Sequence, residues 1–290
     1  MLSPKTLFAS FFKAGVNTLA HDGIEHAGYL AFLGLMAVFP FLVFVAALAG
    51  FIAEGEAGAR FIRLVLAQLP SEMVGALTPR ITEIISGPPQ GLLTVSILGA
   101  IWTSSSAIEG YRTVLNRACR VAAPPAYIWR RLLSIAQILI LSFVVIMAMI
   151  VLVLLPVAWD KVEAVFGKSG LVLPRTEIVS LSIVVVFASV AAVYYFLPNL
   201  KQTIRSVVPG AALVTVSWMA AARLLSLYLS RFNQLTLVYG SLGSVIATLL
   251  FFYACNVIFI YGAELNYLLK MALGEKIEPK KPARTPAGNS

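Results

Sequence analysis

The sequence predicts an all-α polytopic membrane protein, a helix bundle with about six transmembrane helices. Hydrophobic residues make up 59% of its 290 residues and charged residues only 12%, whereas soluble domains are about half apolar and about one quarter charged. The apolar residues form runs of about 20 residues, long enough to cross hydrocarbon as helices. Lys and Arg gather in the segments on one side of these runs, as they do in cytoplasmic loops.

The apolar runs define the expected spans of a membrane domain that covers residues 27–269. The first span contains Pro40, which lacks a backbone N–H and should kink the helix. The second span is short and rich in serine, so it should face other helices rather than lipid. We place the spans at residues 27–52, 91–108, 132–158, 178–197, 209–230 and 241–269.

Three segments lie outside these spans. Residues 1–26 form an expected amphipathic helix, either in the headgroup layer or as a buried cytoplasmic cap on the bundle. Residues 54–90 mix charged and apolar residues at helical spacing, which predicts an amphipathic periplasmic segment. Residues 270–290 are polar, basic and contain proline, so we expect a disordered cytoplasmic tail. The apolar face of the first segment contains Leu7, Phe8, Phe11, Phe12, Gly15 and Leu19.

The distribution of positive charge predicts the orientation. About twice as many Lys and Arg lie on the side that holds both termini as on the other side. We therefore expect both termini in the cytoplasm. The same basic loops account for the net charge of +9, so no nucleic-acid partner is expected.

Two charged residues fall inside the expected spans. Arg223 lies in the fifth span and Glu264 in the sixth, and such residues usually face a bundle interior or a watery cavity. Each shares a helical face with other polar side chains, so two polar stripes can face each other. The stripes comprise Thr215, Arg223, Ser226 and Ser230, and Tyr253, Asn256, Glu264 and Tyr267. Either they line a substrate path, or they hold the bundle together by interhelical hydrogen bonds.

Depth argues against a direct ion pair between Arg223 and Glu264. The two spans run in opposite directions, which separates these residues by on the order of 15 Å along the membrane normal. Small residues at the start of the sixth span predict close helix packing there. The candidate hinge or packing positions are Pro40, Gly240, Gly243 and Gly262.

Residues that could support catalysis are sparse. His21, Asp22, Glu25 and His26 could offer metal ligands on one helix turn, but a polar helix end before a span is the ordinary interpretation. The two cysteines, Cys119 and Cys255, lack the spacing of a zinc site or a disulfide framework. The sequence therefore predicts no catalytic residues, no metal site, no cofactor and no enzyme activity.

An ordered series of short segments resembles the YihY/BrkB family, from about Phe8 to Leu273. The segments are AF at 31–32, VFPF at 38–41, WRRL at 129–132, YYFLPN at 194–199, PG at 209–210, Tyr228, YGSL at 239–242 and GAELN at 262–266. The resemblance implies a six-span bacterial inner-membrane protein. It also implies a family linked by name to serum resistance and formerly labelled ribonuclease BN, with no catalytic residues to carry over.

Three functions follow as hypotheses. The first is transporter-like handling of an envelope lipid or another anionic solute, because Arg223 suits an anionic headgroup. The second is a non-transporting membrane scaffold for envelope assembly, with membrane lipids and envelope-assembly proteins as partners. The tRNA-processing ribonuclease comes last, because the acidic residues are scattered over both sides of the membrane. Substrate, energy coupling and oligomeric state stay open.

Overall fold

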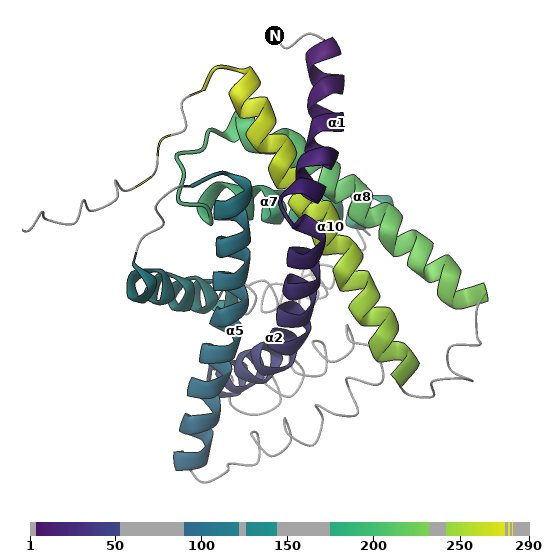
Figure 1. Cartoon of the computed structure of the whole chain (residues 1–290). Coiled ribbons are helices and arrows are strands. Elements are labelled where there is room, and N and C mark those ends of the chain that lie inside the picture. The colour runs from purple at the N-terminus through teal and green to yellow at the C-terminus, as the bar shows by residue number, and fades with distance from the viewer. Residues whose placement is uncertain are drawn as a thin grey trace, which may run out of the picture. The chain divides into compact units, whose positions relative to one another are not determined.

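A computed structural model describes residues 4–52, 90–121, 126–143, 175–231, 242–275, 278 and 280. Among these residues, every regular secondary-structure element is an α-helix, which confirms the predicted all-α class. Residues 127–143 form one of them. The labelled helices are α1 (Pro4–Ala20), α2 (Gly23–Ile52), α5 (Gln90–Ala118), α7 (Arg175–Phe196), α8 (Ile204–Arg231) and α10 (Leu242–Ala272) (Figure 1).

Two of the described helices are long and apolar enough to cross a bilayer. They contain Ile204–Leu227 in α8 and Val245–Ala272 in α10, with mean hydropathies of 1.5 and 2.0. Shorter apolar helices cover Gly23–Val38 and Ile183–Phe196. These helices support a helical membrane protein, and the long pair coincides with the predicted fifth and sixth spans.

Several helices extend past the ends of the predicted spans. The second span was expected to end at residue 108, whereas α5 continues to Ala118. Just past the expected end, the Glu109 carboxylate pairs with the buried Arg112 one turn later in the same helix, with Glu109 Oε2 3.2 Å from Arg112 Nε. A charge that is paired in this way can stay in a buried helix. Residues 54–89 of the expected periplasmic segment and residues 144–158 of the expected third span lie outside the described residues.

The chain folds into two compact units. Unit 1 contains residues 1–34, 109–130 and 175–290, and unit 2 contains residues 35–108 and 131–174. The candidate site described below lies entirely in unit 1.

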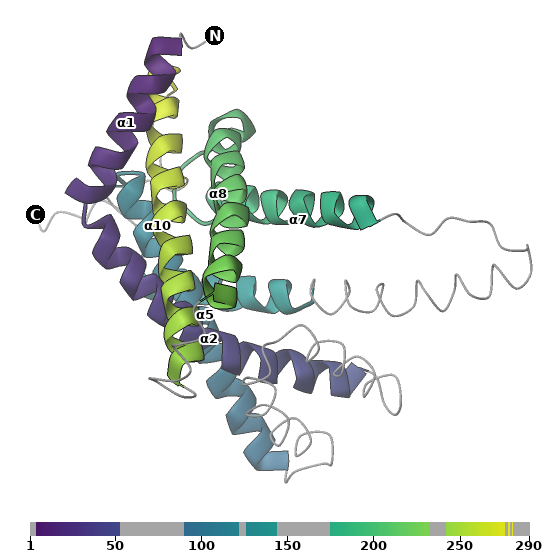
Figure 2. The same ribbon diagram turned by 90° about the vertical axis from the view of Figure 1, so that its right-hand side faces the viewer.

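In unit 1, α10 is the central helix. α8 lies along one side of it and α1 along another, while α7 runs crosswise to α8 (Figure 2). Ala14 of α1 packs with Leu265 and Leu269 of α10 in one small core. A second core joins α2, α5 and α10. Its buried members are Ala27, Leu30, Val114 and Ile260.

α8 and α10 lie in close contact at two glycines. A Cβ atom added at Gly262 would lie 2.5 Å from Val214 Cγ2 and 2.6 Å from Tyr194 Oη. A Cβ atom added at Gly210 would collide with the carbonyl oxygen of Gly262. The Asn266 side chain bridges this contact, because its Oδ1 accepts from the Gly210 N–H at 2.7 Å and its Nδ2 donates to Val207 O at 3.2 Å. Gly262 therefore acts in packing within this structure.

Two residues of the segment that was expected to be a disordered tail contact the α7–α8 loop. The predicted tail begins at residue 270, but α10 continues to Ala272. Beyond it, the Lys201 N–H donates to Glu278 O at 2.8 Å and the Lys280 N–H donates to Asn199 O at 3.3 Å. The Lys280 ammonium also donates to two carbonyls at the end of α7. Glu278 and Lys280 therefore lie against the α7–α8 loop and the end of α7.

Candidate functional site

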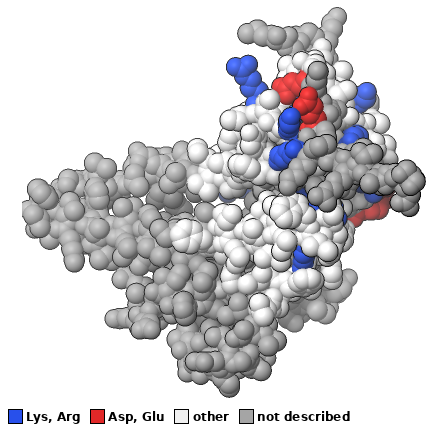
Figure 3. All heavy atoms as spheres, turned by 90° about the vertical axis from the view of Figure 1, so that its left-hand side faces the viewer, with Lys and Arg blue, Asp and Glu red and all other residues white. Residues whose placement is uncertain are grey.

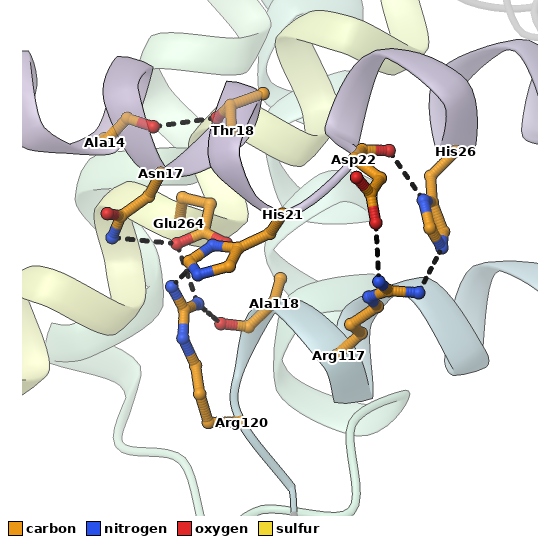
Figure 4. A network of polar contacts seen from close by, with 10 residues as sticks. All are labelled: Ala14, Asn17, Thr18, His21, Asp22, His26, Arg117, Ala118, Arg120 and Glu264. Carbon is orange, nitrogen blue, oxygen red and sulfur yellow. Dashed lines mark hydrogen bonds and ion pairs between the residues drawn. The ribbon is translucent and has the colours of Figure 1, made fainter.

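Glu264 is the centre of a polar network in unit 1 (Figure 4). Its side chain is 1% exposed, although it lies in the apolar helix α10. Arg120 Nη1 lies 2.7 Å from Glu264 Oε2, and His21 Nδ1 lies 3.2 Å from Oε1. Asn17 Nδ2 donates to Oε2 at 3.4 Å. A buried carboxylate is therefore neutralised by a guanidinium and surrounded by hydrogen-bond donors.

The turn between α1 and α2 brings His21 to this carboxylate. α1 ends at Ala20, and the His21 N–H still donates to Asn17 O at 2.9 Å. Asp22 then adopts φ +56°, a left-handed conformation that Asp tolerates better than most residues. This reversal positions the imidazole beside α10, with 42% of the His21 side chain still exposed.

The end of α5 brings Arg120 to the same carboxylate. Arg120 has φ +53°, and the Val121 N–H donates back to Asn116 O at 2.9 Å, which is a common way to close a helix C-terminus. The guanidinium donates to the Ala118 carbonyl and lies 4.4 Å from the centroid of the Tyr267 ring. Carbonyl, carboxylate and ring together fix the position of the cation.

His21 Nδ1 has two competing partners. It lies 3.0 Å from Arg120 Nη2, which can only donate, and 3.2 Å from Glu264 Oε1, which accepts when ionised. One nitrogen cannot satisfy both in a single protonation state. An unprotonated Nδ1 accepts from Arg120, and a protonated Nδ1 donates to Glu264. The two contacts therefore belong to different positions of the imidazole proton.

A second, more exposed cluster lies beside the first. Arg117 Nη2 is 2.7 Å from Asp22 Oδ2, and Arg117 Nη1 is 3.2 Å from His26 Nε2. His26 Nδ1 lies 2.6 Å from Asp22 O, so the neutral imidazole with its proton on Nδ1 satisfies both contacts. A cavity of about 10 Å³, roughly the space for one water molecule, borders His21, His26, Arg117 and Glu264.

The predicted stripe on α10 lies partly in this site. Glu264 and Tyr267 both contact Arg120. Asn256 is buried and donates to Phe252 O within its own helix at 2.8 Å, and Tyr253 is half-buried. The stripe therefore joins the network only at its C-terminal end.

The predicted stripe on α8 does not join the Glu264 network. Thr215 is buried and donates to Ala211 O at 2.8 Å, whereas Arg223 and Ser226 are exposed on α8. Pro40 lies inside α2, which continues as a helix through it. Gly243 lies in the first turn of α10. The side chain of Ser230 and the position Gly240 lie outside the described residues.

Arg120 and Asn17 were missed as site residues by sequence reasoning, and His21 was considered as a metal ligand or, in the favoured interpretation, as part of a polar helix end. Arg120 was treated as a loop charge that fixes orientation. The one available signal was the buried carboxylate itself, because a charge in an apolar helix requires a partner. Among the described residues, no group of three or more His, Cys, Asp or Glu side chains could hold a metal ion.

Further basic residues gather at the same end of unit 1, here called the basic end. They come from the end of α5, the α7–α8 loop, the end of α10 and the tail, and they include Arg117, Arg120, Lys201, Lys270 and Lys280. Lys270 Nζ donates to Lys201 O at 2.5 Å, and Lys201 Nζ lies 2.9 Å from Glu278 Oε2. Lys and Arg side chains lie beside acidic ones over one end of the face in Figure 3.

Burial at the basic end changes two proton affinities. Burial, with a smaller effect of Glu264, raises the pKa of the Cys119 thiol to about 12. Burial also lowers the pKa of the Lys280 ammonium, and the charge of Arg112 lowers it further. Cys119 is therefore a protonated and unreactive thiol at neutral pH.

Comparisons with known proteins agree in pointing to one membrane-protein family. Residues 16–286 match the model of the family described as Virulence factor BrkB. A Bacillus subtilis protein whose name calls it ribonuclease-like, YfkH, is 29% identical over 86% of this chain and 90% of its own length. No solved structure matches the chain.

Two more distant relatives are named only as membrane proteins. A UPF0761 membrane protein of Vibrio parahaemolyticus is 23% identical over 92% of this chain and 83% of its own length. One of Alteromonas mediterranea is 24% identical over 90% of this chain and 86% of its own length. Because the family match covers nearly the whole sequence, the chain belongs to the BrkB family of membrane proteins.

Proposed function

We propose that the protein spans the bacterial inner membrane six times, with both termini in the cytoplasm, and handles an anionic envelope lipid or another anionic solute in a transporter-like manner. The apolar helices α8 and α10 support the membrane location. The gathering of Lys and Arg at the basic end supports the orientation, because positive charge favours the cytoplasmic side.

The observation that carries the proposal is the guanidinium of Arg120. It is 27% exposed and holds a carboxylate that is 1% exposed. A guanidinium suits phosphate and carboxylate groups equally, because its planar N–H donors match two oxygens at once. An anion that reaches the basic end could therefore compete with Glu264 for Arg120.

Replacement of Glu264 by the substrate as the partner of Arg120 would supply a mechanism for transport. When an anionic substrate takes Arg120, Glu264 loses its guanidinium partner and keeps its contact with His21 Nδ1 at the present 3.2 Å. Release of the substrate restores the original pair. Binding is thus coupled to a contact that joins α1, α5 and α10, and such a change can alter how these helices pack.

A liposome assay with purified protein tests this function. Folded protein should move an anionic phospholipid or solute across the bilayer, and Arg120→Gln should slow that movement about tenfold or more. Arg205→Gln, which removes an exposed charge at the start of α8, serves as the matched control. Absence of movement for several lipids and solutes with folded wild-type protein would contradict the proposal.

Arg223 gives a separate test of a role in transport. It is exposed on the apolar helix α8, where its long side chain can reach headgroups by snorkelling. If it serves the substrate, Arg223→Ala should abolish transport with little change in stability, and Arg223→Lys should restore it in part. Full activity of Arg223→Met would end the claim that Arg223 binds substrate.

A scaffold for envelope assembly is the second candidate. The observation that favours it is the apolar outer face of α1, where Phe8 is 78%, Phe12 73% and Leu19 68% exposed. Such a face suits membrane or protein partners. Site-specific crosslinking from Phe8 and Phe12 in cells should capture envelope-assembly proteins, and crosslinks to lipid alone would weigh against this function.

The ribonuclease function suggested by the name of YfkH ranks last among these proposals. Hydrolysis of RNA requires a general base with a nucleophile, or carboxylates gathered around metal ions. The acidic residues of this sequence are spread over many segments instead. Cleavage of precursor tRNA by purified protein, lost in Glu264→Gln, would reverse this order.

A further inference from the structure

Arg131 is a buried cation in unit 2. It lies in the helix at residues 127–143, packs against α5, and is 6% exposed. Its Nη2 donates to Trp102 O at 2.6 Å and its Nη1 donates to Ser106 Oγ at 3.1 Å. The guanidinium carbon lies 4.0 Å from the centroid of the Trp102 ring. All these partners are neutral.

Other buried charges of the described chain have counterions. Arg112 Nε lies 3.2 Å from Glu109, and Glu264 lies 2.7 Å from Arg120. Lys270 Nζ lies 3.8 Å from Glu275. Arg131 takes part in none of the ion pairs between described residues, and its Nε atom is buried without a hydrogen-bond partner.

A buried guanidinium without a counterion is unstable by itself. Carbonyl oxygens and an aromatic face reduce the cost of burying a cation, but they do not neutralise its charge. An anion that accepts from the guanidinium N–H groups would neutralise this charge.

The surface around Arg131 shows which anion fits. Trp102, which stacks on the guanidinium, is 57% exposed, and Leu98 one turn earlier is 62% exposed. A Cβ atom added at Gly99 would meet no atom within 4 Å, so the helix surface there is open. Next to Arg131 on its own helix, Leu132 is 54% exposed. Apolar exposed side chains around a buried cation suit a lipid with acyl chains and an anionic headgroup.

We propose that Arg131 binds a phosphate group, supplied by the headgroup of an anionic phospholipid that lies against α5 beside Trp102. Two phosphate oxygens would accept from the guanidinium, and the acyl chains would cover Leu98 and Leu132. This inference takes only the class of ligand, an anionic lipid, from the proposed function. It concerns binding, which a separate measurement can detect whether or not the protein moves lipid.

Native mass spectrometry of the full-length protein in a neutral detergent tests the proposal. Wild-type protein titrated with phosphatidylglycerol should retain a bound lipid, and Arg131→Met should bind it about tenfold or more weakly. Arg205→Met removes an exposed positive charge in unit 1 and should leave the affinity unchanged. Diacylglycerol, which lacks phosphate, should not replace the phospholipid.

Parallel thermal unfolding distinguishes the two sources of phosphate. Phosphatidylglycerol should raise the melting temperature of wild type and not that of Arg131→Met. An equal rise with inorganic phosphate alone would overturn the lipid assignment and indicate a site for free phosphate.

Unchanged affinity of Arg131→Met for phosphatidylglycerol would overturn the proposal. So would a variant that is more stable than wild type with and without lipid, because the cation would then be a packing residue. If Arg131→Met does not fold, Arg131→Lys decides. It keeps the charge but loses Nε and the paired donors, so wild-type affinity in that variant would contradict the proposal.

Discussion

At the scale of single residues, Glu264 illustrates how a charge is held in an apolar helix. Its two carboxylate oxygens contact Arg120, His21 and Asn17, which come from α5, the α1–α2 turn and α1. Burying a carboxylate without such partners would cost several kcal/mol. The same contacts therefore stabilise unit 1 and form the candidate site.

Removal of the Glu264 charge should destabilise the protein measurably. Glu264→Gln keeps the shape of the side chain but leaves Arg120 without its carboxylate, so the free energy of unfolding should fall by about 1–3 kcal/mol. Glu278→Gln breaks an ion pair in which both side chains are at least half exposed, and should cost less than about 1 kcal/mol. Denaturation in detergent measures the free energy of unfolding of both variants. Equal losses would show that the buried ion pair stabilises the protein no more than the exposed pair does.

Cys119 should resist alkylation. Its side chain is 4% exposed, and burial raises its pKa to about 12, so the reactive thiolate is scarce at pH 7. A maleimide should label Cys119 only after unfolding, whereas a cysteine introduced by Thr113→Cys, at an exposed position of α5, should react in the folded protein. Fast labelling of Cys119 in native protein would mean that the basic end opens readily.

At the scale of elements, the close contact of α8 and α10 depends on two glycines, which have no side chain. Gly210 and Gly262 let the two backbones meet, and Asn266 then bridges them through hydrogen bonds to the backbone of α8. Trp218 Nε1 adds a bond to Cys255 O at 2.9 Å further along the pair. Small residues and polar side chains at such contacts are typical of helix packing in membranes.

Gly262→Ala should therefore weaken the bundle. The added Cβ would lie 2.5 Å from Val214 Cγ2, so the helices must separate, at a cost of about 1–3 kcal/mol. Gly99→Ala adds the same atom where nothing lies within 4 Å and should be neutral or slightly stabilising. Melting temperatures of the two variants measure the difference, and a Gly262→Ala protein as stable as Gly99→Ala would show that α8 can move away freely.

At the scale of the whole molecule, the distribution of charge predicts how the chain crosses the membrane. An even number of spans puts both termini on one side, and the excess of Lys and Arg should keep that side in the cytoplasm. A reporter enzyme that is active only in the periplasm, fused after Ser290, should therefore be inactive. The same reporter placed after Gly87, in the predicted periplasmic segment, should be active, and the reverse pattern would contradict the topology.

The fold class could be predicted from hydropathy alone. In hydrocarbon every backbone N–H and C=O must be satisfied within the chain, so long apolar runs leave few alternatives to helices. The class and the long apolar helices α8 and α10 follow from this rule. The ends of helices are harder to predict from hydropathy. For example, α5 continues past Glu109, whose carboxylate is paired with Arg112 inside the same helix.

The partners of the polar residues were decided only by the tertiary structure. The sequence marked Glu264 as a buried charge, but its contact His21 lies 243 residues away and no local pattern connects them. Arg131 resembles a cytoplasmic loop charge in the sequence, and only its packing against Trp102 makes it a buried cation. Hydropathy depends only on the composition along the chain. An ion pair depends on which helices face each other, and the packing of the helices determines this.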